Sequence, residues 1–255
     1  MTTDTIYDHP LYYDILFDWD RSREAVFYNR IFELNGVGDD EAILEVACGT
    51  GHIAKRLARL DRSVTGMDIS ENMLAFLNDS SVAEGLTVRT VQADMTSFSD
   101  DIIYGAAFNP MSSFRLLQSD GQAEAHLASI AASLRIGGVY VLDLDFRERI
   151  DDPSITTEES WEMNRAGVSV YATNDVIYVD DNGSKLELQW GAEGHLRNYT
   201  VATFIDRVRA VESYVIHAWH PETGRAGEDG VSVFDAENPA ASIHAGRAMV
   251  VLRRV

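Results

Sequence analysis

Short apolar segments alternate with segments of helical periodicity over residues 42–145, and this alternation constrains the fold more than any other feature of the chain. Residues 42–47 form the first apolar run, a turn with two glycines follows, and residues 52–60 carry apolar side chains at helical spacing. Short apolar runs indicate buried strands, and spacings of three or four residues indicate helices. Because strands that alternate with helices pair in parallel, we predict an α/β fold.

The expected elements extend over most of the chain. Strands are expected at residues 42–47, 63–68, 86–92, 102–109, 139–144, 214–219 and 248–253. Helices are expected over residues 11–34, 52–60, 123–134 and 201–210, and in a segment that Ser70 caps. The predicted fold is therefore a Rossmann-like, seven-stranded, mostly parallel sheet with helices on both faces.

The pattern changes after the fifth expected strand. Residues 168–179 and 185–190 resemble the two arms of a hairpin, with the turn signal Asp181-Asn182-Gly183 between them. We predict an antiparallel hairpin insertion at about residues 155–199. The expected organisation is an N-terminal helical cap at residues 1–41, lying over the carboxyl edge of the sheet, and one α/β domain at residues 42–255.

The net charge of −20 over 255 residues narrows the choice of partner. An acidic surface of this strength repels phosphate backbones and anionic lipid headgroups within about a Debye length. No apolar run approaches the length that spans a bilayer. We therefore expect a small-molecule substrate, with neither nucleic acid nor a membrane as partner.

The cysteine content and the N-terminal residues bear on the cellular compartment of the protein. Cys48 is the single cysteine, so neither an internal disulfide nor a metal cluster is expected, and it fits a small buried turn residue better than a nucleophile. The opening MTTDTIYDHP has no basic region followed by an apolar stretch, as a secretion signal has. A cytoplasmic protein without a metal site is predicted.

Three acidic residues close three consecutive expected strands: Glu45, Asp68 and Asp94. The glycines of the turn at residues 47–51 let a ligand approach the backbone closely. A carboxylate at the second strand end can accept hydrogen bonds from ribose hydroxyls, and one at the third can accept from a purine amine. One such residue alone is usually a solvated cap, but the three together predict a nucleoside-binding edge.

A nicotinamide cofactor is one alternative, because GTGHIA fits the dinucleotide fingerprint G-x-G-x-x-A and Asp68 stands in the ribose position. Glu45 argues against it, since the strand end before a dinucleotide turn usually continues apolar. Asp94 is better explained by an adenine. An acidic rim also suits a cationic sulfonium and an amino group better than it suits a pyrophosphate, which favours S-adenosylmethionine.

The segments EVACGTG, GMDISENML, QADM and LRIGGVYVLDL resemble the successive motifs of class I S-adenosylmethionine-dependent methyltransferases. The resemblance extends over nearly the whole chain. It implies that Glu45 lies near the methionine amino group and that Asp68 holds the ribose. It also implies cofactor contacts for the turn residues Ala47, Gly49, Thr50 and Gly51, and for the adenine-side residues Ile69, Met73, Asp94 and Met95.

Residues 12–23 (YYDILFDWDRSR) resemble glycine N-methyltransferase and related small-molecule N-methyltransferases. This resemblance implies that Arg23 pairs with the cofactor carboxylate. Tyr13 then takes the place of an aromatic residue that closes over the methionine part, where a π face suits the sulfonium.

The segment YGAAFNPMSSFRLL at residues 104–117 resembles the sugar-amine N,N-dimethyltransferases, and the resemblance implies that Asn109 faces the methyl group. Asn109-Pro110 is also similar to the motif of DNA amino-methyltransferases, but the second proline and the aromatic residue are missing, and the acidic charge excludes DNA. Gly105 departs from the family, which commonly has aspartate there. Residues 211–213 depart as well, which leaves the register of residues 200–220 open.

Methyl transfer from a sulfonium is an in-line displacement, so alignment and desolvation supply much of the catalysis. An amine acceptor needs no dedicated base, whereas a hydroxyl acceptor needs a base such as histidine or aspartate. The histidine candidates are His195, His217 and His220, and Arg115 and Arg197 are candidates for binding an acidic substrate group. No catalytic residue is assigned.

We predict a methyltransferase for a small molecule, with an amine nitrogen favoured over oxygen and a homodimer through the hairpin insertion as one assembly. The alternatives are a non-catalytic S-adenosylmethionine-binding protein and, third, a nicotinamide-dependent oxidoreductase.

Overall fold

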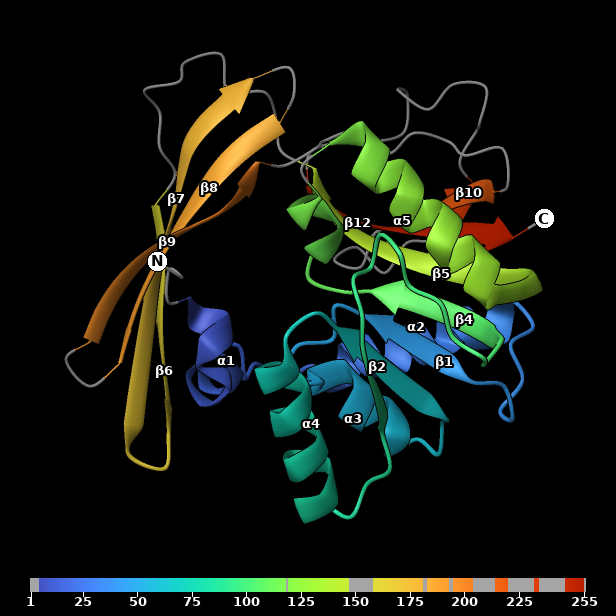
Figure 1. Ribbon diagram of the computed structural model, residues 1–255, viewed down its shortest axis with the longest axis horizontal. Coiled ribbons are helices and arrows are strands. Elements are labelled where there is room, and N and C mark those ends of the chain that lie inside the picture. The colour runs from blue at the N-terminus through green and yellow to red at the C-terminus, as the bar shows by residue number, and fades with distance from the viewer. Residues whose placement is uncertain are drawn as a thin grey trace.

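The computed structural model describes residues 5–117, 119–146, 158–180, 183–192, 195–203, 214–219, 232–233 and 246–254. Its strands form two sheets that lie side by side (Figure 1). The larger sheet has the order β11-β10-β12-β5-β4-β1-β2-β3. Its strands are β1 (Ile43–Val46), β2 (Val64–Asp68), β3 (Arg89–Gln92), β4 (Tyr104–Asn109), β5 (Leu134–Phe146), β10 (Tyr214–Trp219), β11 (Ser232–Val233) and β12 (Gly246–Arg254).

The larger sheet is mostly parallel, as predicted. Strands β1 to β5 pair in parallel, while β12 is antiparallel to both β5 and β10, so β10 runs in the direction of the first five. Six strands therefore share one direction. The two-residue strand β11 pairs with β10 and brings the sheet to eight strands instead of the expected seven.

The strand order reverses beside β1, whose neighbours are β2 and β4. Connections that leave a sheet in opposite directions at such a switch point separate from each other and leave a crevice beyond the carboxyl ends of the strands. The loops after β1 and β4 are therefore the expected walls of a ligand site.

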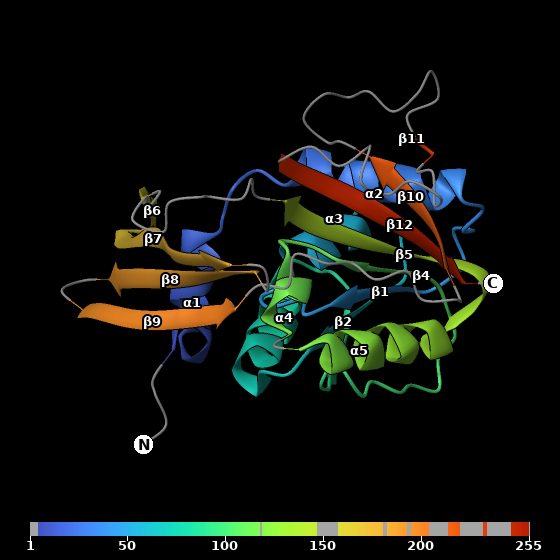
Figure 2. The same ribbon diagram turned by 90° about the horizontal axis from the view of Figure 1, so that it is seen from above.

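Helices cover both faces of the larger sheet (Figure 2). Side chains from α2 (Ser22–Leu34), α3 (His52–Ala58) and α4 (Glu71–Ala83) share one core cluster, and α5 (Asp120–Ser133) contributes to the cluster on the other face. The expected cap by Ser70 is confirmed, because its side chain accepts a hydrogen bond from the Met73 amide at 3.3 Å.

Helix α2 lies on a face of the sheet, although both N-terminal helices were expected over its carboxyl edge. Its buried residues are Ala25, Tyr28, Ile31 and Phe32, at spacings of three and four. Tyr28 packs against Phe108 of β4 with ring centroids 4.7 Å apart, which fixes the helix on the apolar surface of the sheet. The two helical elements before α2, a 3-10 helix at Ile6–Asp8 and α1 (Pro10–Leu16), remain to reach the carboxyl edge.

The second sheet has the order β6-β7-β8-β9, with every pair antiparallel. Its strands are β6 (Glu158–Arg165), β7 (Val168–Asp180), β8 (Gly183–Ala192) and β9 (His195–Thr203). The predicted hairpin is confirmed as β7 and β8, but the insertion contains two further strands. It packs against α1 through a small apolar cluster of Ile6, Ile15, Leu16, Val170 and Ala172.

The helix expected over residues 201–210 is wrong where the structure describes it. Val201 and Thr203 belong to β9 and pair with Leu186 and Lys185 of β8. β-Branched side chains favour the extended backbone of a strand, and the partner strand supplies the backbone hydrogen bonds. Residues 204–210 lie outside the described residues. Within the described chain, no helix has the length and apolarity that crossing a membrane requires.

Candidate functional site

The turn between β1 and α3 is shaped by left-handed backbone. Ala47, Gly49 and Gly51 have φ values of 54°, 53° and 74°. A side chain at Gly51 is excluded because its Cβ would overlap the Leu77 side chain of α4. At Gly49 a Cβ would lie 3.3 Å from the ring of Tyr13, so the tyrosine rests directly on the turn.

Two buried carboxyl groups accept hydrogen bonds from backbone amides of the turn and of the helix that follows it. Glu45 is 2% exposed, and its Oε2 accepts a hydrogen bond from the Ala54 amide at 2.7 Å. Asp68 Oδ2 accepts from the Gly49 amide at 2.7 Å, and its Oδ1 accepts from the Ser70 amide at 2.9 Å. Burial raises the pKa of Glu45 to about 8 and raises that of Asp68. A cationic group beside them, or a ligand that donates hydrogen bonds to them, would lower both pKa values again.

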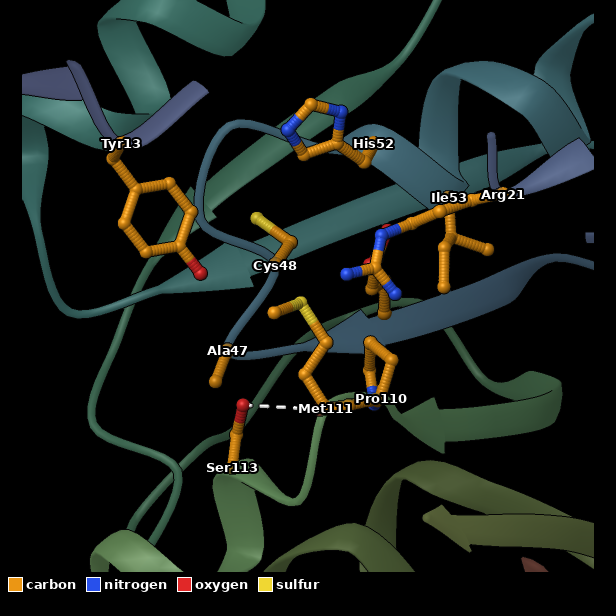
Figure 3. Close-up of a pocket in the computed structure, with 10 residues that line it drawn as sticks. Tyr13, Arg21, Ala47, Cys48, His52, Ile53, Pro110, Met111 and Ser113 are labelled. Atoms are coloured by element: carbon orange, nitrogen blue, oxygen red, sulfur yellow. Dashed lines mark hydrogen bonds between the residues drawn. The ribbon is translucent and has the colours of Figure 1, made fainter. Parts of the chain in front are cut away.

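A small pocket opens beside this turn, with about 310 Å³ of space that includes open solvent (Figure 3). Tyr13 and His52 face it from one side, and Met111 and Ser113 from the opposite side. Its lining consists of Tyr13, Arg21, Glu45, Ala47, Cys48, His52, Ile53, Pro110, Met111 and Ser113. The pocket lies at the switch point, between the loops that follow β1 and β4.

Several buried polar atoms around the pocket have no hydrogen-bond partner among the described residues: Asp14 Oδ1, Arg21 Nε, Thr50 Oγ1 and His52 Nε2. A ligand or ordered water accounts for such atoms, which are rare in native proteins. Asn29, Arg62 and Ser81, which do not line the pocket, also carry unpartnered buried atoms. His52 Nε2 lies 3.3 Å from Asp14 Oδ1 without hydrogen-bond alignment. Burial lowers the pKa of His52, which favours the neutral imidazole.

Arg21 is the arginine of the pocket. It is 5% exposed, its Nη1 donates to Glu24 at 2.8 Å, and its guanidinium lies 5.2 Å from the centre of the Trp19 ring. Arg23, the arginine expected here, is exposed on α2 and does not line the pocket. The sequence DRSR offers two candidates, and the start of α2 at Ser22 leaves Arg21 in the connection that turns towards the site.

The expected cofactor contacts divide into groups in the structure. Tyr13, Glu45 and Ala47 line the pocket. Gly49, Thr50 and Gly51 belong to the adjoining turn and are not in the lining, and Asp68 accepts from the Gly49 amide. Cys48, His52 and Ile53 were not expected in the lining, although each adjoins an expected residue in sequence. Burial raises the pKa of the Cys48 thiol, which agrees with a packing role.

The residues expected at the adenine lie along the neighbouring strand ends, outside the pocket lining. Ile69 is 67% exposed, and Asp94 is exposed with its Oδ1 accepting from the Thr96 amide at 2.8 Å, a bond that lowers the pKa of Asp94. Met95 is half-buried. Met73 is fully buried and presents no surface. Ile69 and Asp94 thus present exposed surface at the strand ends next to Asp68.

Asn109 does not face the pocket. It is fully buried, its Nδ2 donates to the Val46 carbonyl at 3.0 Å, and its Oδ1 accepts from the Phe114 amide at 2.6 Å. Pro110, Met111 and Ser113 form the wall in its place. Met111 and Ser112 both have left-handed backbone, with φ of 57° and 56°, at a cost of about 1–2 kcal/mol per residue.

The remaining candidates contribute no described contact. Arg115, His195, Arg197 and His217 have side chains outside the part of the chain that the structure describes, and His220 lies outside it altogether. Among the described residues, no group of three histidine, cysteine, aspartate or glutamate side chains is placed to hold a metal ion.

Residues 43–138 match the family model described as a methyltransferase domain. Two curated relatives are glycine/sarcosine N-methyltransferases. That of Halorhodospira halochloris is 30% identical over 70% of this chain and 65% of its own length. That of Parasynechococcus marenigrum is 31% identical over 51% of this chain and 47% of its own length. The chain spans less than two thirds of the length of these relatives.

Solved structures of the same fold extend over essentially the whole chain. An S-adenosylmethionine-dependent methyltransferase from Clostridium acetobutylicum has a TM-score of 0.68 at 14% identity, and the match spans 98% of this chain and 99% of that one. A sugar N-methyltransferase from Streptoalloteichus has a TM-score of 0.66 at 19% identity over 100% of this chain and 94% of its own. The fold is the Rossmann-like methyltransferase fold.

Proposed function

We propose that this chain, whose residues 43–138 match the methyltransferase domain model, is an S-adenosylmethionine-dependent methyltransferase that acts on a small molecule. The observation that carries the proposal is the set of unpartnered buried polar atoms, including Arg21 Nε and His52 Nε2, around a glycine turn held by two carboxyl groups. A zwitterionic amino acid joined to a nucleoside has the groups that such a site lacks.

The residues present fit that cofactor. Glu45 suits the cationic amino group, and the buried Arg21 guanidinium suits the carboxylate. Asp68 has lone pairs left after its two amide contacts and suits the ribose hydroxyls. Beside it, the exposed Ile69 offers an apolar surface for the adenine, with Asp94 at the amine edge and Met95 alongside.

The bound cofactor supplies an electrophilic methyl group on a sulfonium, and the protein supplies alignment and exclusion of water. Tyr13 lies against Gly49 and is positioned to cover the ligand from above. Burial lowers the pKa of His52 and so makes its imidazole a weak base. A site with such a base suits an amine acceptor, which arrives unprotonated, better than a hydroxyl. We therefore favour amine nitrogen as the acceptor atom.

The names of the relatives support the same substrate class. Two of them are glycine/sarcosine N-methyltransferases, and one structural neighbour is a sugar N-methyltransferase. The helical cap at residues 1–41, the domain at 42–255 with its insertion at about 155–199, dimerisation through that insertion and a cytoplasmic location stay predictions.

Calorimetric titration with S-adenosylmethionine and S-adenosylhomocysteine tests the cofactor assignment. Wild-type protein is expected to bind both, and Asp68→Ala to weaken binding by about tenfold or more because a charge-assisted hydrogen bond is lost. Asp101→Ala, which removes an exposed aspartate in the loop before β4, is the matched control and should bind normally. Unchanged binding in Asp68→Ala contradicts the assignment.

Activity is then measured with radiolabelled S-adenosylmethionine and a panel of glycine, sarcosine, amino sugars, sugars and phenols. Turnover with an amine supports the proposal, whereas turnover confined to phenols moves the acceptor to oxygen. Tight binding without turnover on any class favours a non-catalytic binding protein. Thermal protection by NAD, and none by S-adenosylhomocysteine, favours the nicotinamide alternative.

A further inference from the structure

One side chain joins the two loops that form the walls of the crevice. Asn109 is the last residue of β4, and its Nδ2 donates to the carbonyl of Val46, the last residue of β1. Its Oδ1 accepts from the Phe114 amide at 2.6 Å and so closes the loop that begins at Pro110. With the side chain fully buried, both ends of the amide are used in fixing backbone.

The loop that Asn109 closes is held in an unfavourable conformation. Met111 and Ser112 are consecutive left-handed residues, and neither is glycine. The Met111 amide donates to Asp143 Oδ2 of β5 at 2.8 Å, and Asp143 is fully buried. Strained backbone persists only where its surroundings determine it, and it concentrates at functional sites. Asn109 and Asp143 are the two buried groups that determine it here.

The strained loop lies where the reacting part of the cofactor belongs. In the proposed function the ribose lies at Asp68 and the amino acid part at Glu45 and Arg21. The sulfonium connects these two parts and so lies above the end of β1. Met111 and Ser113 face this position from across the pocket (Figure 3). They are therefore placed beside the methyl group, on the side from which an acceptor must approach in line.

We propose that Asn109 and Asp143 are positioning residues. They hold the loop at residues 110–113 so that it lines the space in which the acceptor approaches the transferable methyl group. The inference rests on the proposed function. It assigns Asn109 an indirect role, because the side chain acts through Pro110, Met111 and Ser113 and touches neither the methyl group nor the acceptor.

A pair of ligands that differ at the sulfonium tests this without knowledge of the acceptor. S-Adenosylmethionine carries the methyl group, and S-adenosylhomocysteine lacks it. Asn109→Asp keeps the oxygen that accepts from Phe114 but replaces the donor to Val46 with a second oxygen. We expect S-adenosylmethionine to bind about fourfold more weakly, the value of one buried methyl group, with S-adenosylhomocysteine changed less than about twofold.

The matched control is Asn35→Asp at the end of α2. Asn35 likewise donates from Nδ2 to a backbone carbonyl, that of Ile31 at 2.8 Å, but it packs near Arg253 and Gly137, away from the pocket. This variant keeps the oxygen that accepts from Arg253 and gives that guanidinium a charged partner, and it should leave the ratio of the two dissociation constants unchanged. Asp143→Ala, which removes the acceptor of the Met111 amide, should change the ratio in the same direction as Asn109→Asp.

Turnover supplies a second readout with any amine that the panel identifies. In Asn109→Asp, kcat should fall by about tenfold or more while KM for S-adenosylmethionine changes by no more than about fourfold. A lower melting temperature with an unchanged ratio and unchanged kcat overturns the inference, as does an equal loss of both ligands. If Asn109→Asp fails to fold, Asp143→Ala decides. Failure of wild-type protein to bind either ligand rejects the proposed function itself.

Discussion

Arg165 of β6 donates from Nη2 to Asp14 Oδ2 of α1 at 2.6 Å, and this pair joins the inserted sheet to the helix that carries Tyr13. The other oxygen of Asp14 lies 3.3 Å from His52, a residue of the pocket lining. Trp161 reinforces the junction by donating from Nε1 to the Leu16 carbonyl at 3.1 Å. The inserted sheet is thereby linked through α1 to the pocket.

Arg165→Gln should loosen α1. The Asp14 side chain is only 5% exposed, so removal of its cationic partner leaves a poorly compensated buried carboxylate, at a cost of about 1–3 kcal/mol. Hydrogen exchange of residues 10–16 should accelerate, and KM for S-adenosylmethionine should rise as Tyr13 loses its support. Arg30→Gln, which breaks an exposed pair with Glu33, is the control and should change neither. Unchanged exchange in α1 would show that Arg165 does not hold it.

Cofactor binding should release a proton. Burial raises the pKa of Glu45 to about 8, so the carboxyl is protonated at pH 7 without ligand, and a cationic amino group beside it lowers that pKa again. Affinity should therefore rise with pH up to about pH 8, by at most about tenfold per pH unit. Calorimetry at pH 7 in buffers of different ionisation enthalpy measures the released proton directly. Glu45→Gln should bind more weakly and release none.

The same group makes stability depend on pH. The folded state holds the Glu45 proton more tightly than the unfolded state, whose pKa is near 4.5, so this contribution is full below pH 4.5 and is lost as the pH rises towards 8. Denaturation of wild-type protein and Glu45→Gln at matched pH values isolates it. A difference that stays constant over this range would contradict the raised pKa.

His126 should make the opposite contribution. It is fully buried, with Nδ1 2.9 Å from the Met95 carbonyl and Nε2 2.7 Å from the Tyr140 hydroxyl, and burial lowers its pKa from 6.5 to about 4. Unfolding takes up a proton between these values, so stability falls as the pH falls from 6.5 to 4. His126→Asn should reduce the slope by at most about 1.4 kcal/mol per pH unit, measured by urea denaturation. An unchanged slope would place the acid sensitivity elsewhere.

Gly105→Ala should destabilise the protein without affecting the ligand site. A Cβ at Gly105 would lie 2.8 Å from Glu41 Oε1 and 2.9 Å from Glu41 Cβ, and Glu41 is held in place by Arg135. We expect a loss of about 1–3 kcal/mol by urea denaturation. Gly121→Ala in α5 is the control, because the added Cβ would meet only Ser119 Oγ, at 4.0 Å. This substitution should be neutral or stabilise the protein by up to about 1 kcal/mol. Equal changes in stability in the two variants would show that the contact with Glu41 is not the cause.

Local patterns predicted the centre of the parallel sheet because β1 and β4 are buried on both faces and read as apolar runs, whereas the edge strand β3 is half exposed. All four residues of β1 and all six of β4 are buried. The glycine turn was equally visible, since its conformation depends on Gly49 and Gly51 themselves. Glu45 and Asp68 follow from this turn, because their partners are the amides of Ala54, Gly49 and Ser70 nearby.

Contacts between distant segments explain what the sequence did not reveal. The absence of a side chain at Gly105 leaves room for Glu41, which pairs with Arg135 at a separation of 94 positions in the chain. Which of Arg21 and Arg23 reaches the pocket depends on the orientation of α2. The packing of Tyr28 against Phe108 fixes that orientation. The strand assignment of Val201 likewise depends on β8 as a partner and not on local propensity.

The burial of Cys48 makes the protein a convenient subject for fluorescence labelling. It is the single cysteine of the chain, it is 7% exposed, and its raised thiol pKa leaves almost no thiolate to react with maleimides. A cysteine introduced at the exposed Tyr171 of β7 would therefore take a dye selectively without prior removal of a native thiol. A second one at the exposed Glu124 of α5 would complete a donor and acceptor pair, and energy transfer would measure the distance between the inserted sheet and α5 with and without ligand.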